Sequence, residues 1–271
     1  MQLLLKLLDS DMITPTNYGW FHLMFIGIVI LTTFLFCYFF KDASNKTFNR
    51  ISLICWIIIV ILELYKQFVF SYTLGENTVT WDYQWYAFPF QFCSSPIYVL
   101  PFIIFIKNNK IKEIFVAFMV SFSLFAGLVV FIYPNDVFID TIGINIQTMI
   151  HHGLQIVLGV FFAVYYRNSL NIKWWLKSIL VFVGLVIVAL GLNLIVHNIL
   201  QANNIDETFN MFYISPYFEC TLPVLSIFYD LLPYALFLIL YIVGFAIAAF
   251  VVFIITSTII NFVRKKKIAN A

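Results

Sequence analysis

Cysteine and histidine are the residue types in this sequence best suited to covalent chemistry, and it contains four of each. His151 and His152 are adjacent, and Cys93 lies in a separate apolar segment. A cysteine becomes an effective nucleophile when a neighbouring histidine accepts its proton, because the thiolate is the attacking form. Such a pair can take up an acyl group as a thioester and pass it on. Acyl transfer is therefore one hypothesis, provided that the fold brings Cys93 to a histidine.

The other arrangements of these residues favour neither a metal site nor a disulfide framework. Cys37, Cys55, Cys93 and Cys220 show no paired spacing and no CxxC motif. The histidines show no HxxxH or HxxE spacing on one helix, and adjacent helical residues point about 100° apart. The sequence also has no P-loop, dinucleotide fingerprint or haem motif. We therefore predict no metal and no cofactor.

Composition places these residues in a membrane protein. The 271 residues are 63% hydrophobic and 10% charged, with a mean hydropathy of +0.97. A soluble domain of this size would carry about 25% charged residues. There is no low-complexity tract, glycine period or broad basic face, which excludes disordered, collagen-like and nucleic-acid-binding chains. We predict a multi-pass protein of the cell membrane, with membrane phospholipids rather than nucleic acid as partners.

Seven segments are long and apolar enough to cross a bilayer, since a spanning helix needs about 20 residues. The prediction is an all-α, polytopic transmembrane bundle that forms one integral membrane domain over residues 1–271. Its helices are expected at about 20–40, 51–71, 88–106, 114–133, 146–166, 174–197 and 231–262.

The basic residues predict the orientation of this bundle. Thirteen of the 15 lysines and arginines follow the first, third, fifth and seventh helices: Lys41, Lys46, Arg50, Lys107, Lys110, Lys112, Arg167, Lys173, Lys177, Arg264, Lys265, Lys266 and Lys267. The alternate connections contain Lys6 as their only base. Because Lys and Arg near helix ends stay on the cytoplasmic side, we expect the amino terminus outside and the carboxyl terminus inside. Residues 198–230 then form an extracytoplasmic loop, either a plain connection or a segment packed over the bundle.

Polar residues of several predicted helices fall at one depth in the outer half of the bundle. Cys93, His151 and His152 each lie about five or six residues from an outer helix end, on the order of 8–9 Å below the boundary. Polar side chains in hydrocarbon are costly, so a shared depth favours a common site. The other candidate substrate-binding or supporting residues at this level are His22, Glu63, Lys66, Gln67, Gln91, Ser94, Gln147, Gln155, Asn193 and His197.

Several of these residues have structural roles as alternatives. Glu63 and Lys66 are three residues apart on one helix face, so they can form a bridge that neutralises two buried charges. The glutamines can serve as interhelical hydrogen-bond donors and acceptors, and His22 and His197 can reach water at the interface. Prolines on both sides of Cys93 would disturb its helix, and the freed N–H groups, with Ser94 and Ser95, could form an oxyanion site.

Two of the polar motifs, and a third looser segment, resemble those of a known family. The segment FPFQFC, Phe88 to Cys93, resembles the LPxxLC element of the YwaF-type bacterial integral membrane proteins. HHG, His151 to Gly153, is similar to their SHG element, and ELYKQF, Glu63 to Phe68, is similar to a looser feature of the family. The resemblance extends from about Trp20 to Phe262.

This sequence departs from the family pattern beside both motifs. Phe88 and Phe92 replace the motif leucines, Ser94 stands where an acidic or amide residue is common, and His151 precedes the motif histidine. The resemblance implies a relationship to animal ether-phospholipid acyltransferases that use a cysteine and a histidine in the membrane. On that basis Cys93 is the nucleophile and His152 the general base, with His151 the alternate if the alignment shifts by one.

Two classes of function are compatible with these features. The first is a lipid acyltransferase or lipid hydrolase near the outer leaflet, in which Cys93 attacks an ester of a lipid held between helices, aided by His152. The alternative is a non-enzymatic transporter or ligand-binding heptahelical protein whose polar residues receive a small molecule from outside. A scaffold for a larger membrane assembly is a third possibility. The distance between the Cys93 sulfur and the His152 ring discriminates between the first two.

Overall fold

Helices make up most of the computed structural model, which describes residues 2–75, 78–134 and 137–269. The long helices are α2 (Trp20–Phe40), α3 (Asn45–Val69), α7 (Ile142–Tyr165), α8 (Ile172–Ala202) and α10 (Tyr234–Ala269). A further rod consists of α5 (Asn109–Phe118), the π-helical turn η3 (Met119–Ser123) and α6 (Leu124–Ile132). Among the described residues, these six helices are long and apolar enough to cross a membrane. The predicted all-α polytopic bundle is confirmed.

The predicted third helix, 88–106, is the one that differs most from the structure. Only Phe92–Phe105 is helical, as the 3₁₀ turn η2 (Phe92–Ser94) followed by α4 (Ser95–Phe105). At a rise of about 1.5 Å per residue, this helix spans about 20 Å, less than the roughly 30 Å of a hydrocarbon core. Pro96 lies in the first turn of α4, where proline is tolerated, whereas the stretch around Pro89 is not helical. Cys93 is therefore at the start of a short helix rather than inside a spanning one.

Helix boundaries elsewhere follow capping residues rather than the edges of the apolar runs. Ser44 caps α3 by accepting a hydrogen bond from the Thr47 N–H, so the helix includes Lys46 and Arg50 and begins before the predicted residue 51. Asn108 and Asn171 cap α5 and α8 in the same way. α8 continues past the predicted residue 197 to Ala202.

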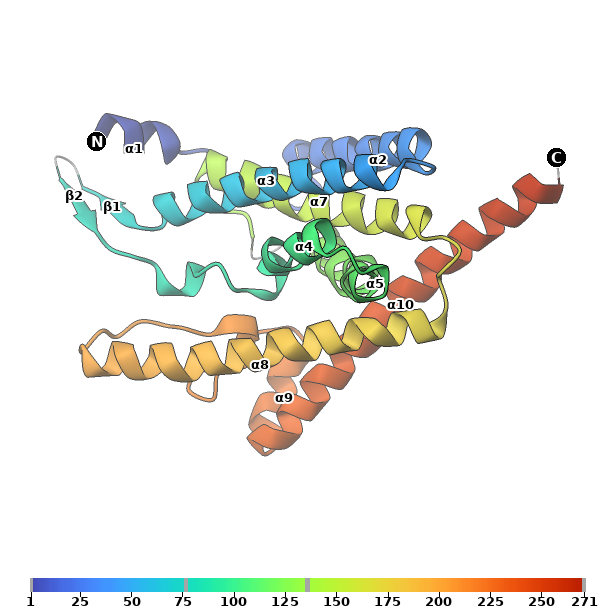
Figure 1. Cartoon of the computed structure of the whole chain (residues 1–271). Helices are drawn as coiled ribbons and strands as arrows, with labels where there is room; N and C mark the ends of the chain where they lie inside the picture. Colours follow the sequence, from blue (N-terminus) through green and yellow to red (C-terminus); the bar gives the residue numbers. More distant parts are fainter. Residues whose placement is uncertain (1, 76–77, 135–136, 270–271) are drawn as a thin grey trace.

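The α5–η3–α6 rod and α7 form the centre of the bundle, and most of their residues are buried. α7 packs against α2, α3, α6, η3 and α10, and α5 packs against α8. In Figure 1, α2, α3 and α7 lie along one side, α8 lies along the other, and α4 and α5 lie between them. α10 crosses the bundle obliquely and ends at the opposite end from α1. The site described below lies where α3, η2 and α7 meet.

Short elements gather at the end of the bundle that holds the amino terminus (Figure 1). They are α1 (Gln2–Leu8) and the antiparallel strands β1 (Tyr72–Leu74) and β2 (Val79–Trp81), none of which the apolar pattern predicted. The 3₁₀ turn η1 (Trp85–Ala87) follows β2, and the 3₁₀ turn η4 (Met211–Tyr213) follows α8. Residues 203–224, which contain η4, lead into α9 (Leu225–Leu231). The predicted loop 198–230 is thus partly helical at both of its ends.

Candidate functional site

Cys93 lies in the turn that starts the short helix. The N–H groups of the two serines after it close this turn: Ser94 donates to the Gln91 carbonyl at 2.8 Å, and Ser95 donates to the Phe92 carbonyl. The backbone N–H groups of Ser94 and Ser95 are therefore engaged and are not free for the expected oxyanion site. Cys93 itself is half-buried, and its position at a helix amino terminus favours the thiolate electrostatically.

Two side chains of α7 hold the Cys93 turn in place. The Nε2 atoms of His151 and Gln155 both bind the Cys93 carbonyl oxygen, at 2.9 Å and 2.5 Å. The two residues are four apart, so they lie on one face of α7. Because a carbonyl oxygen only accepts, His151 carries its hydrogen on Nε2, and neutral His151 leaves Nδ1 as an acceptor.

His152 is oriented the opposite way by its own helix. Its Nδ1 donates to the Thr148 carbonyl at 2.8 Å, so the neutral ring has its lone pair on Nε2. The ring is half-buried and lies next to that of His151, with the centroids 5.3 Å apart. His152 is thus in the tautomer of a general base. In the described part of the chain, no hydrogen bond joins the Cys93 thiol to either imidazole; His151 binds the Cys93 carbonyl instead, and the His152 ring contacts that of His151.

Two glycines allow neighbouring helices to approach α7 at this level. A Cβ atom on Gly153 would lie 2.6 Å from Cγ2 of Val29 in α2. One on Gly127 of α6 would lie 2.8 Å from the His152 carbonyl oxygen. The glycine that follows His152 therefore has a packing role.

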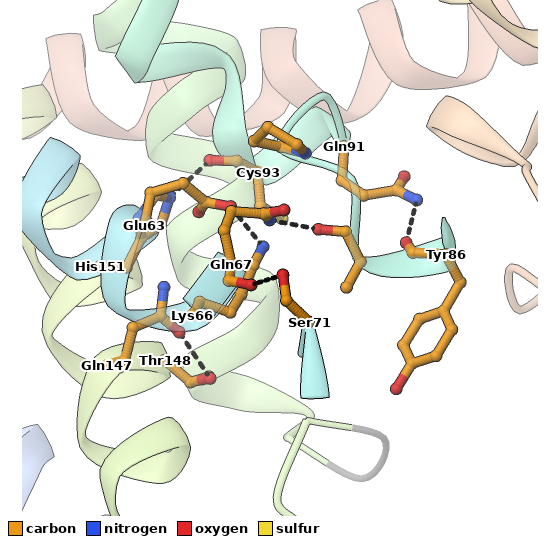
Figure 2. A network of polar contacts seen from close by, with 12 residues as sticks. Glu63, Lys66, Gln67, Ser71, Tyr86, Gln91, Cys93, Gln147, Thr148 and His151 are labelled. Atoms are coloured by element: carbon orange, nitrogen blue, oxygen red, sulfur yellow. Dashed lines mark hydrogen bonds and ion pairs between the residues drawn. The ribbon is translucent and has the colours of Figure 1, made fainter. Parts of the chain in front are cut away.

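An ion pair on α3 forms the opposite wall of the site (Figure 2). Glu63 Oε1 accepts from both Lys66 Nζ and Gln67 Nε2, each at 2.8 Å. Gln67 also donates to the Ala87 carbonyl at 2.7 Å, which ties α3 to the segment that precedes Cys93. Lys66 is close enough to interact electrostatically with Cys93, His151 and His152. A cation here favours a thiolate at position 93, although burial of the thiol opposes the charged form more strongly.

Tyr83, in the connection between β2 and η1, completes this wall from outside the spanning helices. Its hydroxyl donates to Gln67 Oε1 at 2.6 Å. Burial, followed by the charge of Glu63 and by Tyr98, raises the pKa of Tyr83 to about 12. The hydroxyl therefore stays protonated at neutral pH and holds Gln67 with its amide directed at Glu63.

Several acceptor atoms in this region are buried without a hydrogen-bond partner among the described residues. They are Glu63 Oε2, His151 Nδ1 and Gln155 Oε1, and each belongs to a group whose other polar atom is bound. An unpaired buried acceptor costs about 1–3 kcal/mol, so such atoms are uncommon where they serve packing alone. This arrangement suits a ligand that brings hydrogen-bond donors, such as hydroxyl groups or water.

Gln91 and Asn193, expected near the substrate, instead fix the segment 203–224. Gln91 Oε1 accepts from the Phe212 N–H at 3.1 Å, and Gln91 Nε2 donates to the Asn210 carbonyl at 3.3 Å. Asn193 exchanges two hydrogen bonds with the backbone of Met211, at 2.7 and 3.0 Å. These bonds hold Phe212 and Tyr213 at positive φ, 59° and 57°, which is unfavourable for bulky residues.

The remaining predicted residues lie on separate contacts. His22 accepts the Tyr18 N–H on Nδ1, and His197 stacks on Tyr217 with the ring centroids 3.7 Å apart. Gln147 accepts a long hydrogen bond from Thr148, and Ser94 is buried. In the described residues, no hydrogen bond or ring contact joins His22 or His197 to Cys93, His151 or His152. The structure thus gathers Cys93, His151, His152, Gln155, Glu63 and Lys66, and separates the two interface histidines from them.

One candidate was missed from the sequence. Tyr241 of α10 is fully buried, and its hydroxyl has no partner among the described residues. Its ring contacts Phe245 at 4.5 Å, and Phe245 contacts Phe92, the residue before Cys93, at 5.0 Å. Tyrosine normally occurs at the membrane interface, so a tyrosine in the middle of an apolar span was the available signal.

Two clefts open on the described part of the structure. One of about 870 Å³ lies between α1, the end of α3 and the β1–β2 hairpin, and one of about 540 Å³ lies along the segment 203–224. Tyr86 lines both clefts, and Gln91 lines the second. Among the described residues that line the two clefts, neither Cys93 nor either adjacent histidine is present.

Comparison with known proteins places the chain in a group of membrane proteins. The model of the TMEM164 family matches residues 14–257, which include Cys93, both adjacent histidines and every spanning helix at least in part. No curated protein and no solved structure matches the chain.

Proposed function

The chain belongs to the TMEM164 family of membrane proteins, and we propose that it is a membrane-embedded lipid acyltransferase or lipid hydrolase. In this proposal Cys93 is the nucleophile and His152 the general base. The acyl group comes from a membrane phospholipid and passes through a thioester on Cys93. The orientation predicted from the basic residues puts this reaction in the outer leaflet.

The proposal depends most on the contacts that α7 makes with Cys93 and within its own turn at His152. His151 and Gln155 bind the carbonyl of Cys93, and the next residue after His151 is fixed with its lone pair on Nε2. The carbonyl of Cys93 and the ring of His152 are thus both held by α7, the first through His151 and Gln155 and the second through Thr148. A thiol with an ordinary pKa near 8.5 is mostly protonated at neutral pH and needs such a base. Their lack of a hydrogen bond is compatible with this role, since such bonds are often long until substrate binds.

The polar surroundings support the same reading. Lys66 and the amino terminus of α4 favour the thiolate of Cys93. The unpaired acceptors of His151, Gln155 and Glu63 suit the hydroxyl of an acyl-accepting lysolipid, or water in the hydrolytic reaction. Each reaction begins with the same thioester, and the acceptor decides between transfer and hydrolysis.

Acyl-chain exchange on defined phospholipids, measured with purified protein in vesicles, tests the proposal. We expect Cys93→Ala and His152→Ala each to abolish exchange and release while the protein stays folded and inserted. The double variant should be scarcely worse than either single variant, because the two residues act as one unit. A wild-type protein that leaves every tested phospholipid unchanged, yet binds or moves a small solute, would favour the transporter or receptor alternative.

A further inference from the structure

The cleft of about 540 Å³ along the segment 203–224 is lined mainly by aromatic side chains. Its volume falls within the range of small-molecule sites, about 300–1,000 Å³. Four of the nine described residues that line it are aromatic: Tyr86, Tyr213, Tyr217 and Phe218. The three tyrosines are between 36% and 50% exposed, so their rings are accessible to a ligand. We call this feature the aromatic cleft.

The aromatic cleft has a negative charge. Glu219 is exposed in its lining, and none of the ion pairs among the described residues involves this carboxylate. The described lining contains no lysine or arginine. The whole segment 203–224 has three carboxylates, Asp206, Glu207 and Glu219, and likewise no lysine or arginine. Because a cleft lined by charge of one sign concentrates ions of the other, this cleft favours a cation.

The hydrogen bonds of the lining indicate which kind of cation fits. Gln91 accepts from the Phe212 N–H and donates to the Asn210 carbonyl. The Asn210 side chain accepts from the Ser215 N–H at 2.8 Å and donates to the Glu219 carbonyl at 3.1 Å. Both amides of the lining are therefore used within the protein. A metal ion would need more ligands than one carboxylate, and a primary ammonium group has three N–H donors to satisfy. A fully methylated ammonium has no N–H group and binds to the faces of aromatic rings.

The rings of the aromatic cleft are held in place before any ligand binds. The Tyr217 ring stacks on His197 of α8, with the centroids 3.7 Å apart. Gln91, which binds the segment 203–224, also donates to the Tyr86 carbonyl at 3.4 Å (Figure 2). Tyr213 has a φ of 57°, a strained value of the kind that occurs at ligand-binding segments. Side chains that are already ordered lower the entropic cost of binding.

We propose that the aromatic cleft binds a quaternary ammonium group, with the cation against the rings of its lining and the charge balanced by Glu219. Such a cation is attracted to a ring face within about 6 Å of the centroid. Its methyl groups also bury apolar surface against the rings. Cys93 is absent from the described lining, so this inference stands apart from the proposed reaction. The ammonium group can belong to a free solute or to the choline headgroup of a lipid.

Binding of radiolabelled choline, measured by equilibrium dialysis, tests this inference on purified full-length protein in a maltoside detergent. We expect saturable binding that tetramethylammonium displaces. The alcohol 3,3-dimethylbutanol has the shape of choline without its charge, and ethanolamine has the charge without the methyl groups. Each should compete at least about 10-fold more weakly than tetramethylammonium does. The inference is overturned if the wild-type protein shows no saturable binding, or if either analogue competes equally well.

Two substitutions remove the ring and the carboxylate separately. Tyr217→Leu and Glu219→Gln should each weaken choline binding about 10-fold, whereas Tyr217→Phe keeps a ring face and should stay within about 3-fold of wild type. Tyr38→Leu and Asp230→Asn are the matched controls, because both residues are exposed and lie outside the described lining. If Tyr217→Leu lowers the melting temperature, Glu219→Gln decides alone, since it changes an exposed side chain without changing its size. Unchanged binding in Glu219→Gln, or an equal loss in the controls, would contradict the proposal.

A lipid-like competitor distinguishes the two sources of the ammonium group. Displacement of choline by dodecylphosphocholine as well as by tetramethylammonium would identify a lipid headgroup, and displacement by the free cation alone would identify a solute. Cys93→Ala should bind choline as tightly as wild type does. Failure of the proposed reaction would thus leave this inference standing, and a loss of choline binding in Cys93→Ala would contradict the separation of the two sites.

Discussion

Two adjacent histidines are bound through different ring nitrogens, and the proposed function gives them different roles. In that proposal His151 is a positioning residue, since its Nε2 binds the carbonyl of Cys93, and Gln155 binds the same oxygen. His152 keeps its Nε2 lone pair because Nδ1 is held by Thr148. Figure 2 shows His151 and Cys93 joined by this contact, with Glu63 and Lys66 beside them. The residue type alone could not separate these roles.

His151→Ala should therefore be milder than His152→Ala. The Gln155 hydrogen bond still holds the Cys93 turn without His151, whereas nothing replaces a general base. We expect His151→Ala to retain measurable acyl exchange, reduced about 10-fold by a looser turn, since misplacement can cost up to about 100-fold. Equal loss in the two variants, at equal thermal stability, would mean that His151 is the base instead.

The Glu63–Lys66 pair should tolerate loss of both members better than loss of one. Their side chains are only 7% and 16% exposed, so a single apolar replacement strands a charge in a low-dielectric layer. Breaking a buried pair costs about 3–5 kcal/mol, whereas replacing both charges is often close to neutral. We expect Glu63→Leu and Lys66→Leu each to lower the melting temperature more than the double variant does. If both single variants are tolerated equally well, then both groups reach water.

At the scale of the elements, Gly153 sets the distance between α2 and α7. A Cβ atom at this position would collide with Val29, so Gly153→Ala should destabilise the protein by about 1–3 kcal/mol, as overpacking does. Val29→Ala should restore part of the loss by removing the colliding methyl groups. Gly184→Ala in α8 is the matched control, because nothing lies within 4 Å of its Cβ position, and it should be neutral or stabilising. Thermal unfolding of Gly153→Ala, of the Gly153→Ala/Val29→Ala double variant and of Gly184→Ala checks this, and a Gly153→Ala protein as stable as wild type would contradict the close packing.

Most spanning helices could be predicted from the sequence because lipid imposes a long apolar run on each of them. The third helix could not, since apolar composition does not distinguish a spanning helix from a short one that begins inside the bundle. Pro89 and Pro96 were the local signal, and the structure places the start of the helix between them. The β1–β2 hairpin was missed because three-residue strands leave almost no periodic pattern.

The site was predictable only in part, for a similar reason. Counting depth from helix ends identified Cys93, His151, His152, Glu63 and Lys66 as neighbours in level, and these residues do gather in one region. Depth does not give direction around a helix axis, so His22 and His197 were grouped with residues that they do not contact. Gln91 and Asn193 bind the backbone of residues 210–212, and no sequence pattern shows which side chains bind the backbone of a loop.

For the whole molecule, the orientation in the membrane stays a prediction from charge. A cysteine introduced at Asn203 should react with an impermeant maleimide in intact cells, and one at Asn108 should not. Both positions are exposed in the structure, so accessibility within the fold does not limit either reaction. Cells that express the wild-type protein serve as the control, because they show any labelling of the native cysteines. Asn77, a third suitable external position, lies outside the described residues. Labelling at 108 from outside would reverse the orientation and move the site to the inner leaflet.

A thioester on Cys93 is the most direct test of the account. Purified protein is mixed with vesicles of a phosphatidylcholine whose acyl chains carry an isotopic label, quenched in acid, and analysed by peptide mass spectrometry. We expect a labelled acyl group on Cys93 that hydroxylamine removes, and that is absent in His152→Ala. Unmodified Cys93 at every time point, in a sample that nevertheless exchanges acyl chains between lipids, would contradict the central role of this cysteine.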